Sequence, residues 1–270
     1  MSRIDDTFHE LSSTARKGFI PFVTAGDPDI ATSLKIIMSL AISGASIIEL
    51  GVPFSDPMAD GPTIQRSSQR SLAAGTNLAM IIHMVGEFRK VSSVPIVLFS
   101  YFNPLMRFGI DKLCTEAADA GIDGILITDA VGFEAADVAA RLRKVSIDLI
   151  SLIAPTTSNE RLAEIAKNAS GFLYAVSRAG VTGSRSEMTG DARKLVKRAR
   201  AVTDLPVAVG FGISTSEQIR EVWEYADAAV VGSAIVSEIE KAVGVCDPVE
   251  KVEPFVGTLV PEIAKRPQEV

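Results

Sequence analysis

The sequence predicts an α/β protein built as a single (β/α)8 barrel, the TIM-barrel class, and three observations support this fold. Eight short runs rich in Val, Ile and Leu alternate with longer amphipathic runs, which is typical of repeated strand–helix units. The apolar runs are uninterrupted, so we expect helices to cover both faces of a parallel sheet. Eight such units close more naturally into a barrel than into an open sheet.

The predicted elements follow one another without a break in composition. The strands are expected at residues 19–24, 46–50, 96–101, 124–129, 148–154, 172–177, 207–210 and 228–232. Asp27-Pro28 is expected to cap the helix that ends near residue 43, and Ser214-Thr215 to open the helix that runs through Tyr225.

Additional helices are expected at residues 3–15, within 51–95, where a loop precedes two helices, and in the tail after Cys246. One domain therefore covers residues 1–270, with a barrel core at about 18–245 and a helical tail at 246–270.

Composition argues against several classes of function. The net charge is −6 without a basic stripe, which disfavours a nucleic-acid-binding surface. No apolar run reaches the roughly twenty residues that cross a bilayer, and the N-terminus lacks a secretory signal, so we expect a cytoplasmic protein without membrane contact. Cys114 and Cys246 are too far apart for a disulfide framework, and His9 and His83 have no second ligand at helical spacing, so no metal site is expected.

Glu49 is a carboxylate inside a predicted strand, between Ile48 and Leu50. With normal alternation, Ile47 and Glu49 face the barrel interior while Ile48 and Leu50 face the helices. A carboxylate in that place loses hydration, tends toward a raised pKa and can exchange protons near neutral pH. The alternative is a glutamate paired with a buried cation, but no Lys or Arg lies in any predicted strand, so we favour catalysis.

Two aspartates near strand ends give weaker signals, although catalytic groups collect at these ends in such barrels. Asp60 follows Glu49 by eleven residues and lies beside Gly61-Pro62, where an aspartate is often only a turn former. Asp129, at the end of the fourth predicted strand, is either a site carboxylate or a cap for the next helix.

Two glycine-containing junctions predict a phosphate site. VAVGFGIS at 207–214 and VVGSAIV at 230–236 each end a strand and then begin a helix, and free backbone N–H groups at such junctions bind anions. The candidates are Gly212, Gly232 and Ser233. A single junction would indicate only a tight turn or a helix cap, but two adjacent ones in loops seven and eight favour phosphate.

Other residues near the predicted strand ends could complete a pocket. Residues 177–190 are long enough to form a lid, with Gly183 adding an N–H to the phosphate, or are an ordinary solvated loop. Apolar and aromatic candidates for the barrel mouth are Phe22, Phe99, Leu126, Tyr174 and Phe211. Such residues are more often plain core, and their positions near strand ends favour the pocket.

Longer motifs resemble one family. ELGVPFSDPMADGPTIQ at 49–65, SRAGVTG at 177–183, PFVTAGDP at 21–28, and the later GFGIS and GSAIV resemble the tryptophan synthase alpha subunit, over about residues 18–240. The resemblance implies a barrel that cleaves indole-3-glycerol phosphate to indole and D-glyceraldehyde 3-phosphate, a retro-aldol lyase reaction of L-tryptophan biosynthesis. It implies no metal or organic cofactor in this subunit.

The same resemblance implies roles for individual residues. Glu49 is then the general acid–base that helps to protonate the indole C3 carbon, and Asp60 holds the indole N–H. The phosphate is surrounded by Gly183, Phe211, Gly212, Gly232 and Ser233. The indole and glycerol are flanked by Phe22, Phe99, Tyr101, Leu126 and Tyr174. Thr182 belongs to the mobile loop that orders the lid and Asp60.

A partner is also implied by the resemblance. It is a beta subunit, dependent on pyridoxal phosphate, that receives indole through a tunnel in an alpha2beta2 complex, and Asp56 lies in the segment that communicates with it. The chain departs from the family after the fourth predicted strand, where Asp129-Ala130-Val131-Gly132 stands in place of an aspartate soon followed by proline. That loop lies near the partner in the family, so the departure bears on the strength of the contact.

Other functions fit part of the sequence. The same lyase could work alone and release free indole. A non-catalytic barrel that only activates a partner has little reason to keep both Glu49 and Asp60. A phosphosugar isomerase or epimerase would share the phosphate loops but not the ADGPTIQ segment at 59–65.

Overall fold

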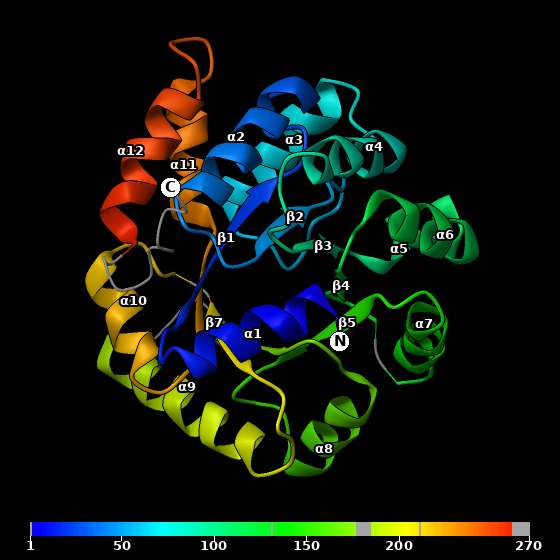
Figure 1. The fold of residues 1–270 in the computed structure, drawn as a ribbon, viewed down its shortest axis with the longest axis vertical. Coiled ribbons are helices and arrows are strands. Elements are labelled where there is room, and N and C mark those ends of the chain that lie inside the picture. Colours follow the sequence, from blue (N-terminus) through cyan, green and yellow to red (C-terminus); the bar gives the residue numbers. More distant parts are fainter. Residues whose placement is uncertain (1, 131, 177–184, 211, 261–270) are drawn as a thin grey trace.

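Eight parallel strands close into one barrel in which each strand pairs with its neighbours in the sequence (Figure 1). The computed structural model describes residues 2–130, 132–176, 185–210 and 212–260. The strands are β1 (Gly18–Thr24), β2 (Ile48–Gly51), β3 (Ile96–Ser100), β4 (Gly124–Ile127), β5 (Asp148–Ile153), β6 (Leu173–Val176), β7 (Val207–Gly210) and β8 (Ala228–Val231). The predicted (β/α)8 barrel is therefore confirmed.

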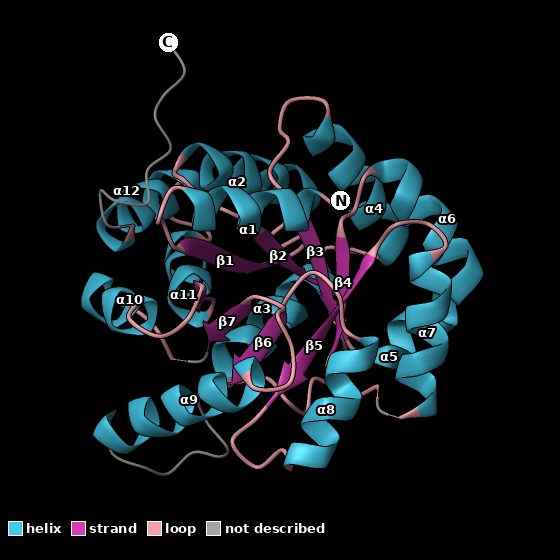
Figure 2. Cartoon of the chain, turned by 60° about the horizontal axis from the view of Figure 1, so that its bottom comes forward, coloured by secondary structure: helices cyan, strands magenta, loops and turns pink. Residues whose placement is uncertain are grey.

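Helices surround the barrel on its outside (Figure 2). Those of the first half are α1 (Arg3–Ser13), α2 (Ile30–Ile42), α3 (Pro62–Ala73), α4 (Leu78–Arg89), α5 (Phe102–Phe108) and α6 (Ile110–Ala120). Those of the second half are α7 (Phe133–Arg143), α8 (Asn159–Asn168), α9 (Arg185–Arg200), α10 (Ser216–Trp223), α11 (Ser233–Ala242) and α12 (Val249–Leu259). In the described parts of the chain, no helix is long and apolar enough to cross a membrane.

Several predicted boundaries differ from the observed ones. The fourth strand was expected to reach residue 129 but ends at Ile127, which is its last residue paired with β3, opposite Ser100. The segment after β3 also contains two helices, α5 and α6, which the hydrophobic periodicity did not distinguish from one continuous helix. Gly109 ends α5 and begins α6. Its φ of 95° lies in the region of backbone conformation that favours glycine.

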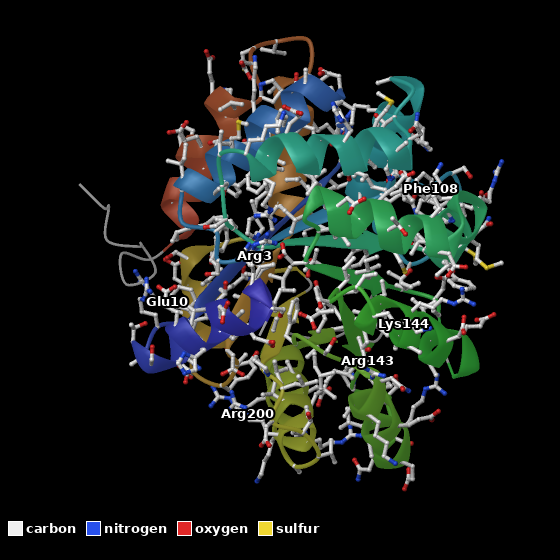
Figure 3. All side chains as sticks on the ribbon, turned by 45° about the vertical axis from the view of Figure 1, so that its right-hand side comes forward. Arg3, Glu10, Phe108, Arg143, Lys144 and Arg200 are labelled. Atoms are coloured by element: carbon white, nitrogen blue, oxygen red, sulfur yellow. The ribbon has the colours of Figure 1, made fainter. Side chains whose placement is uncertain are left out.

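The N-terminal helix α1 closes the barrel at the N-terminal ends of the strands. Its buried side chains Ile4, Phe8 and Leu11 join the cluster of residues that fills the barrel interior. Phe8 packs on Phe172 with ring centroids 5.6 Å apart. Arg3, which is labelled on α1 in Figure 3, donates to Asp123 at 2.6 Å. The side chains of α1 therefore cover the N-terminal end of the barrel interior.

The predicted cap of α2 at Asp27-Pro28 is wrong. Asp29 is the N-cap and accepts a hydrogen bond from the N–H of Thr32 at 2.9 Å. Asp27 is instead fully buried and forms a bidentate ion pair with Arg70 of α3, in which both N–O distances are 2.8 Å. A buried carboxylate needs such a partner, and the sequence does not show which distant cation supplies it. The predicted helix start at Thr215 is confirmed, since its side chain caps α10.

Buried polar contacts fix α3 on the C-terminal end of β1. The Thr24 and Ser67 hydroxyls lie 2.6 Å apart, and the Ser71 hydroxyl donates to the carbonyl of Ala25 at 2.7 Å. Arg70 also donates to Glu240 of α11 at 2.9 Å, so one guanidinium joins the loop after β1, α3 and α11. Because α3 begins at Pro62, these contacts also anchor the loop that carries Asp60.

Replacing Arg70 should destabilise the protein strongly. Arg70→Met leaves the Asp27 carboxylate buried without its cation, so we expect the free energy of unfolding to fall by about 3–5 kcal/mol. Arg66→Met is the matched control, because Arg66 binds the same Glu240 from a side chain that is 50% exposed. Urea unfolding at pH 7 measures both. Equal losses in the two variants would contradict a special role for the buried pair.

Candidate active site

Glu49 occupies the barrel interior as predicted. Its neighbour Ile47 belongs to the interior cluster, whereas Ile48 and Leu50 belong to the cluster between strands and helices. The Glu49 side chain is fully buried, and within the described residues neither carboxylate oxygen has a hydrogen-bond partner. Burial raises the pKa of this carboxyl group to about 8, so it carries a proton at neutral pH.

Asp60 lies in the loop between β2 and α3, close to Tyr101 at the end of β3. The Tyr101 hydroxyl accepts a hydrogen bond from the N–H of Ala59 at 2.9 Å, and its interaction with the Asp60 carboxylate favours the ionised form of that group. The Gln65 amide donates to the backbone carbonyl of Asp60 at 2.9 Å. Burial raises the pKa of Asp60 to about 6, and the Tyr101 hydrogen bond acts in the opposite direction. Asp60 is therefore largely ionised at neutral pH, unlike Glu49.

Aromatic residues predicted for the barrel mouth form a continuous group next to Glu49. Phe22 pairs with Glu49 in the β1–β2 register, and its ring meets Phe99 edge-on with centroids 5.3 Å apart. Phe99 meets Tyr174 edge-on at 6.4 Å and pairs with Leu126 in the β3–β4 register. The charge of Glu49 contributes to the raised pKa of the Tyr174 phenol, although burial contributes more. These five residues thus surround one end of the interior.

Two glycines at strand ends leave room for this group. A Cβ atom on Gly51 would lie 2.6 Å from the ring of Phe22, and one on Gly210 would lie 2.1 Å from the Tyr174 hydroxyl. Both distances are far below van der Waals contact, so any larger residue would displace the aromatic ring.

The predicted phosphate ligands lie near the same mouth. Gly232 follows β8 and is the N-cap of α11, which begins at Ser233, so Ser233 is not itself the cap. A Cβ atom on Gly232 would lie 3.3 Å from Phe22, so this helix start borders the aromatic group. Gly212 adopts φ of 76° after β7. Phosphate binding by these residues stays a prediction. Thr182, Gly183 and Phe211 lie outside the described residues.

The remaining predicted aspartates lie outside the catalytic group. Asp129 accepts a hydrogen bond from the N–H of Phe102 at 2.7 Å, so it binds the start of α5 and does not cap α7. Asp56 is exposed in the loop before Asp60 and accepts from the Ser55 hydroxyl at 2.5 Å. Across the described ranges, no three His, Cys, Asp or Glu side chains gather in a way that could hold a metal ion.

Sequence reasoning missed Leu152 on β5. Leu152 pairs with Tyr174 in the β5–β6 register and packs against the interior cluster from a partly exposed position. The alternation rule that placed Glu49 would also have found it. The contact of Tyr101 with Ala59 has no local sequence signal, because the two residues are 42 positions apart.

Comparison with known proteins identifies a consistent group of relatives. The family described as "Tryptophan synthase alpha chain" matches residues 8–260. A protein named tryptophan synthase alpha chain from Citrifermentans bemidjiense is 47% identical over 98% of this chain and 99% of its own length. One of the same name from Polynucleobacter asymbioticus is 49% identical over 90% of this chain and 92% of its own.

Solved structures agree with the sequence relatives. The tryptophan synthase subunit alpha from Legionella pneumophila superposes with a TM-score of 0.88 at 36% identity, covering 96% of this chain and 97% of that one. A chain of tryptophan synthase from M. tuberculosis, in an aminoacrylate-bound form, gives a TM-score of 0.86 at 32% identity, covering 96% and 98%. The fold and the order of its elements are therefore those of these relatives.

The buried carboxyl group predicts a pH-dependent effect of Glu49→Gln. The folded protein keeps the Glu49 proton up to about pH 8, whereas a solvated glutamate loses it near the ordinary value of 4.5. The wild type therefore loses stability as the pH rises through this window, and the glutamine variant avoids that loss. Relative to the wild type, the free energy of unfolding of Glu49→Gln should increase by about 3–5 kcal/mol across the window.

Urea unfolding at several pH values between 5 and 9 measures this difference. Glu134→Gln, on the exposed surface of α7, is a control for replacing a solvated carboxylate. A constant difference between Glu49→Gln and the wild type over this range would contradict the raised pKa.

Proposed function

The chain belongs to the tryptophan synthase alpha chain family, and from this membership we propose that it cleaves indole-3-glycerol phosphate to indole and D-glyceraldehyde 3-phosphate. The observation that carries the proposal is the protonated Glu49 carboxyl group, which is buried beside an aromatic cluster and has no hydrogen-bond partner among the described residues. An acid in such a place can protonate carbon, and the aromatic walls suit a flat indole ring.

The reaction begins with a proton transfer to the indole ring. Glu49 donates its proton to C3, which forms an indoleninium cation with positive charge on nitrogen. Asp60, ionised at neutral pH, accepts a hydrogen bond from the ring N–H and stabilises that charge. The two carboxyl groups suit different tasks because their environments set their pKa values apart.

Carbon–carbon cleavage then begins with loss of a proton from the glycerol part of the substrate. A base, for which the Glu49 carboxylate is now available, removes the proton of the hydroxyl group on the carbon attached to C3. That oxygen forms the aldehyde, the bond to C3 breaks, and its electrons restore the indole ring. One proton is gained and one is lost, so the reaction needs no redox partner, and we expect no cofactor in this chain.

The substrate is held along the barrel mouth. We assign the indole and glycerol to the neighbourhood of Phe22, Phe99, Tyr101, Leu126 and Tyr174. We assign the phosphate to the backbone of Gly212, Gly232 and Ser233, with Gly183 and Phe211, and Thr182 to the ordering of the lid and Asp60. Backbone N–H groups at the start of α11 suit this task because they bind an anion without a basic side chain.

The alpha chain of tryptophan synthase is one subunit of a complex. We propose that this chain binds a beta subunit in an alpha2beta2 assembly in the cytoplasm, with pyridoxal phosphate held only by the partner. The exposed Asp56 loop, which also presents the 94% exposed Met58, suits such a contact. The alternative is a stand-alone lyase that releases free indole.

Indole release from indole-3-glycerol phosphate, with and without a cognate beta subunit, tests the proposal. Glu49→Gln should lower turnover by roughly 10²–10⁴-fold, because the carbon acid is lost, while glycerol phosphate still binds. Substantial turnover in this variant would refute the role of Glu49. Co-elution and activation by the beta subunit are expected, and their absence would favour the stand-alone enzyme.

The pH profile of kcat/KM should be bell-shaped. Activity should rise through about pH 6 as Asp60 ionises and fall through about pH 8 as Glu49 loses its proton. Tyr101→Phe should move the acid limb to higher pH, since the hydroxyl lowers the pKa of Asp60. Phe54→Leu removes a ring next to Tyr101 but keeps the hydroxyl, so it should leave that limb in place. An unmoved limb in Tyr101→Phe would contradict the assignment to Asp60.

A further inference from the structure

The helix α3 begins two residues after Asp60, and its first turn has no buried side chain. The first buried residue of α3 is Ser67, so close packing on the barrel starts one turn after the helix does. Pro62 is exposed, and residues 63–65 are only partly buried. Packing therefore fixes the middle of α3, and the position of its first turn depends on other contacts.

An ion pair with α11 holds this first turn. The Arg66 guanidinium donates two hydrogen bonds to the Glu240 carboxylate, with N–O distances of 2.6 and 2.8 Å. Such a bidentate pair fixes the orientation of the two groups as well as their distance. In the described part of the chain, no other hydrogen bond or ion pair joins residues 62–66 to another helix or to a strand.

The Glu240 carboxylate is itself held by a second arginine of α3. Arg70 donates to it at 2.9 Å, and the other N–H groups of this guanidinium bind the fully buried Asp27. Glu240 therefore lies between two arginines that are one helical turn apart and is itself 29% exposed. Hydrogen bonds from Arg66 and the charges of both arginines lower the pKa of Glu240 to about 2, so the bridge stays ionised at neutral pH.

The helix α11 is a firm support for this bridge. Its side chains Ile235 and Ile239 are fully buried in the cluster between strands and helices. Ile239 directly precedes Glu240, so the backbone that carries the carboxylate is anchored in the core. The ion pair therefore places the exposed first turn of α3 relative to a helix whose own position is fixed by packing.

The first turn of α3 is connected to Asp60 by a direct hydrogen bond. Gln65, next to Arg66 in the chain, donates its side-chain amide to the backbone carbonyl of Asp60 at 2.9 Å. Burial is the main cause of the raised pKa of Asp60, and Tyr101 is the titratable group that acts against it. A displacement of the first turn would therefore change the hydration of the Asp60 carboxylate, and with it its pKa.

We propose that Glu240 is a positioning residue for Asp60. It acts through Arg66 and the first turn of α3, and it holds the Asp60 carboxylate at the depth in the barrel mouth where the carboxylate meets the indole N–H. The inference rests on the proposed function, which gives Asp60 this task. Because α11 begins next to Gly232 and Ser233, the same bridge sets the spacing between Asp60 and the proposed phosphate ligands.

The variant Glu240→Gln removes the charge of the bridge and nearly keeps its shape. We expect kcat for indole release to fall by about threefold to tenfold, because a small displacement of a catalytic group is costly. The acid limb of the pH profile should move below about pH 6, because Asp60 becomes better hydrated. Inhibition by glycerol 3-phosphate should stay within about twofold, since α11 keeps its packing. A general loss of stability would not move the acid limb.

Two further variants separate this bridge from the loss of any ion pair. Arg66→Met breaks the same bridge from α3 and should move the acid limb in the same direction. Glu238→Gln is the matched control, because Glu238 pairs with Lys241 of its own helix at 2.6 Å. It should leave kcat within about twofold and the acid limb in place. Bridge variants on two different helices protect the test against misfolding of one.

An NMR titration of the Asp60 carboxyl carbon supplies a measurement that does not depend on activity. Its midpoint should lie near pH 6 in the wild type and in Glu238→Gln, and lower in both bridge variants. A midpoint and an acid limb that stay at their wild-type values in Glu240→Gln and Arg66→Met would overturn the inference. A wild type that releases no indole would refute the proposed function, and the titration would still decide the role of Glu240.

Discussion

Closure of eight parallel strands into a barrel forces every second side chain of each strand into an interior with little water. In this chain α1 covers the N-terminal end, and the interior cluster among the described residues is apolar and aromatic. Glu49 is placed in that interior by the alternation of β2 alone. Its raised pKa therefore comes from burial and not from a charged neighbour. The fold itself supplies a neutral acid at physiological pH.

Asp60 depends on a different kind of support. It lies on a loop, where backbone position is less constrained than in a strand, and two sets of contacts restrict it. Tyr101 binds the loop directly, and the buried Asp27–Arg70 pair holds α3, which starts two residues after Asp60. Partial burial and the Tyr101 hydroxyl then keep its pKa between those of a solvated aspartate and of Glu49. The acid Glu49 therefore lies on a rigid strand, whereas the charge-stabilising Asp60 lies on a loop that side-chain contacts hold in place.

Local patterns in the sequence were enough for the strands and for the direction of Glu49, because strand length and alternation are properties of neighbouring residues. They were also enough to bring Phe22, Phe99 and Tyr174 to one end of the barrel. Local patterns gave the wrong role for Asp27. An aspartate before a proline is typical of a helix start, and its ion-pair partner Arg70 is 43 residues away. Helix ends within one apolar pattern, such as the break at Gly109, depend on a single backbone conformation that periodicity does not contain.

The end of β4 also depends on nonlocal contacts. After Leu126, the chain of β4 bonds towards β3, first through Thr128 to Ser100 and then through Asp129 to the N–H of Phe102. The second bond exists because α5 begins directly after β3 and leaves that N–H without a helical partner. The extra helix therefore gives Asp129 its role, because the carboxylate binds the first N–H of α5 and not the start of α7.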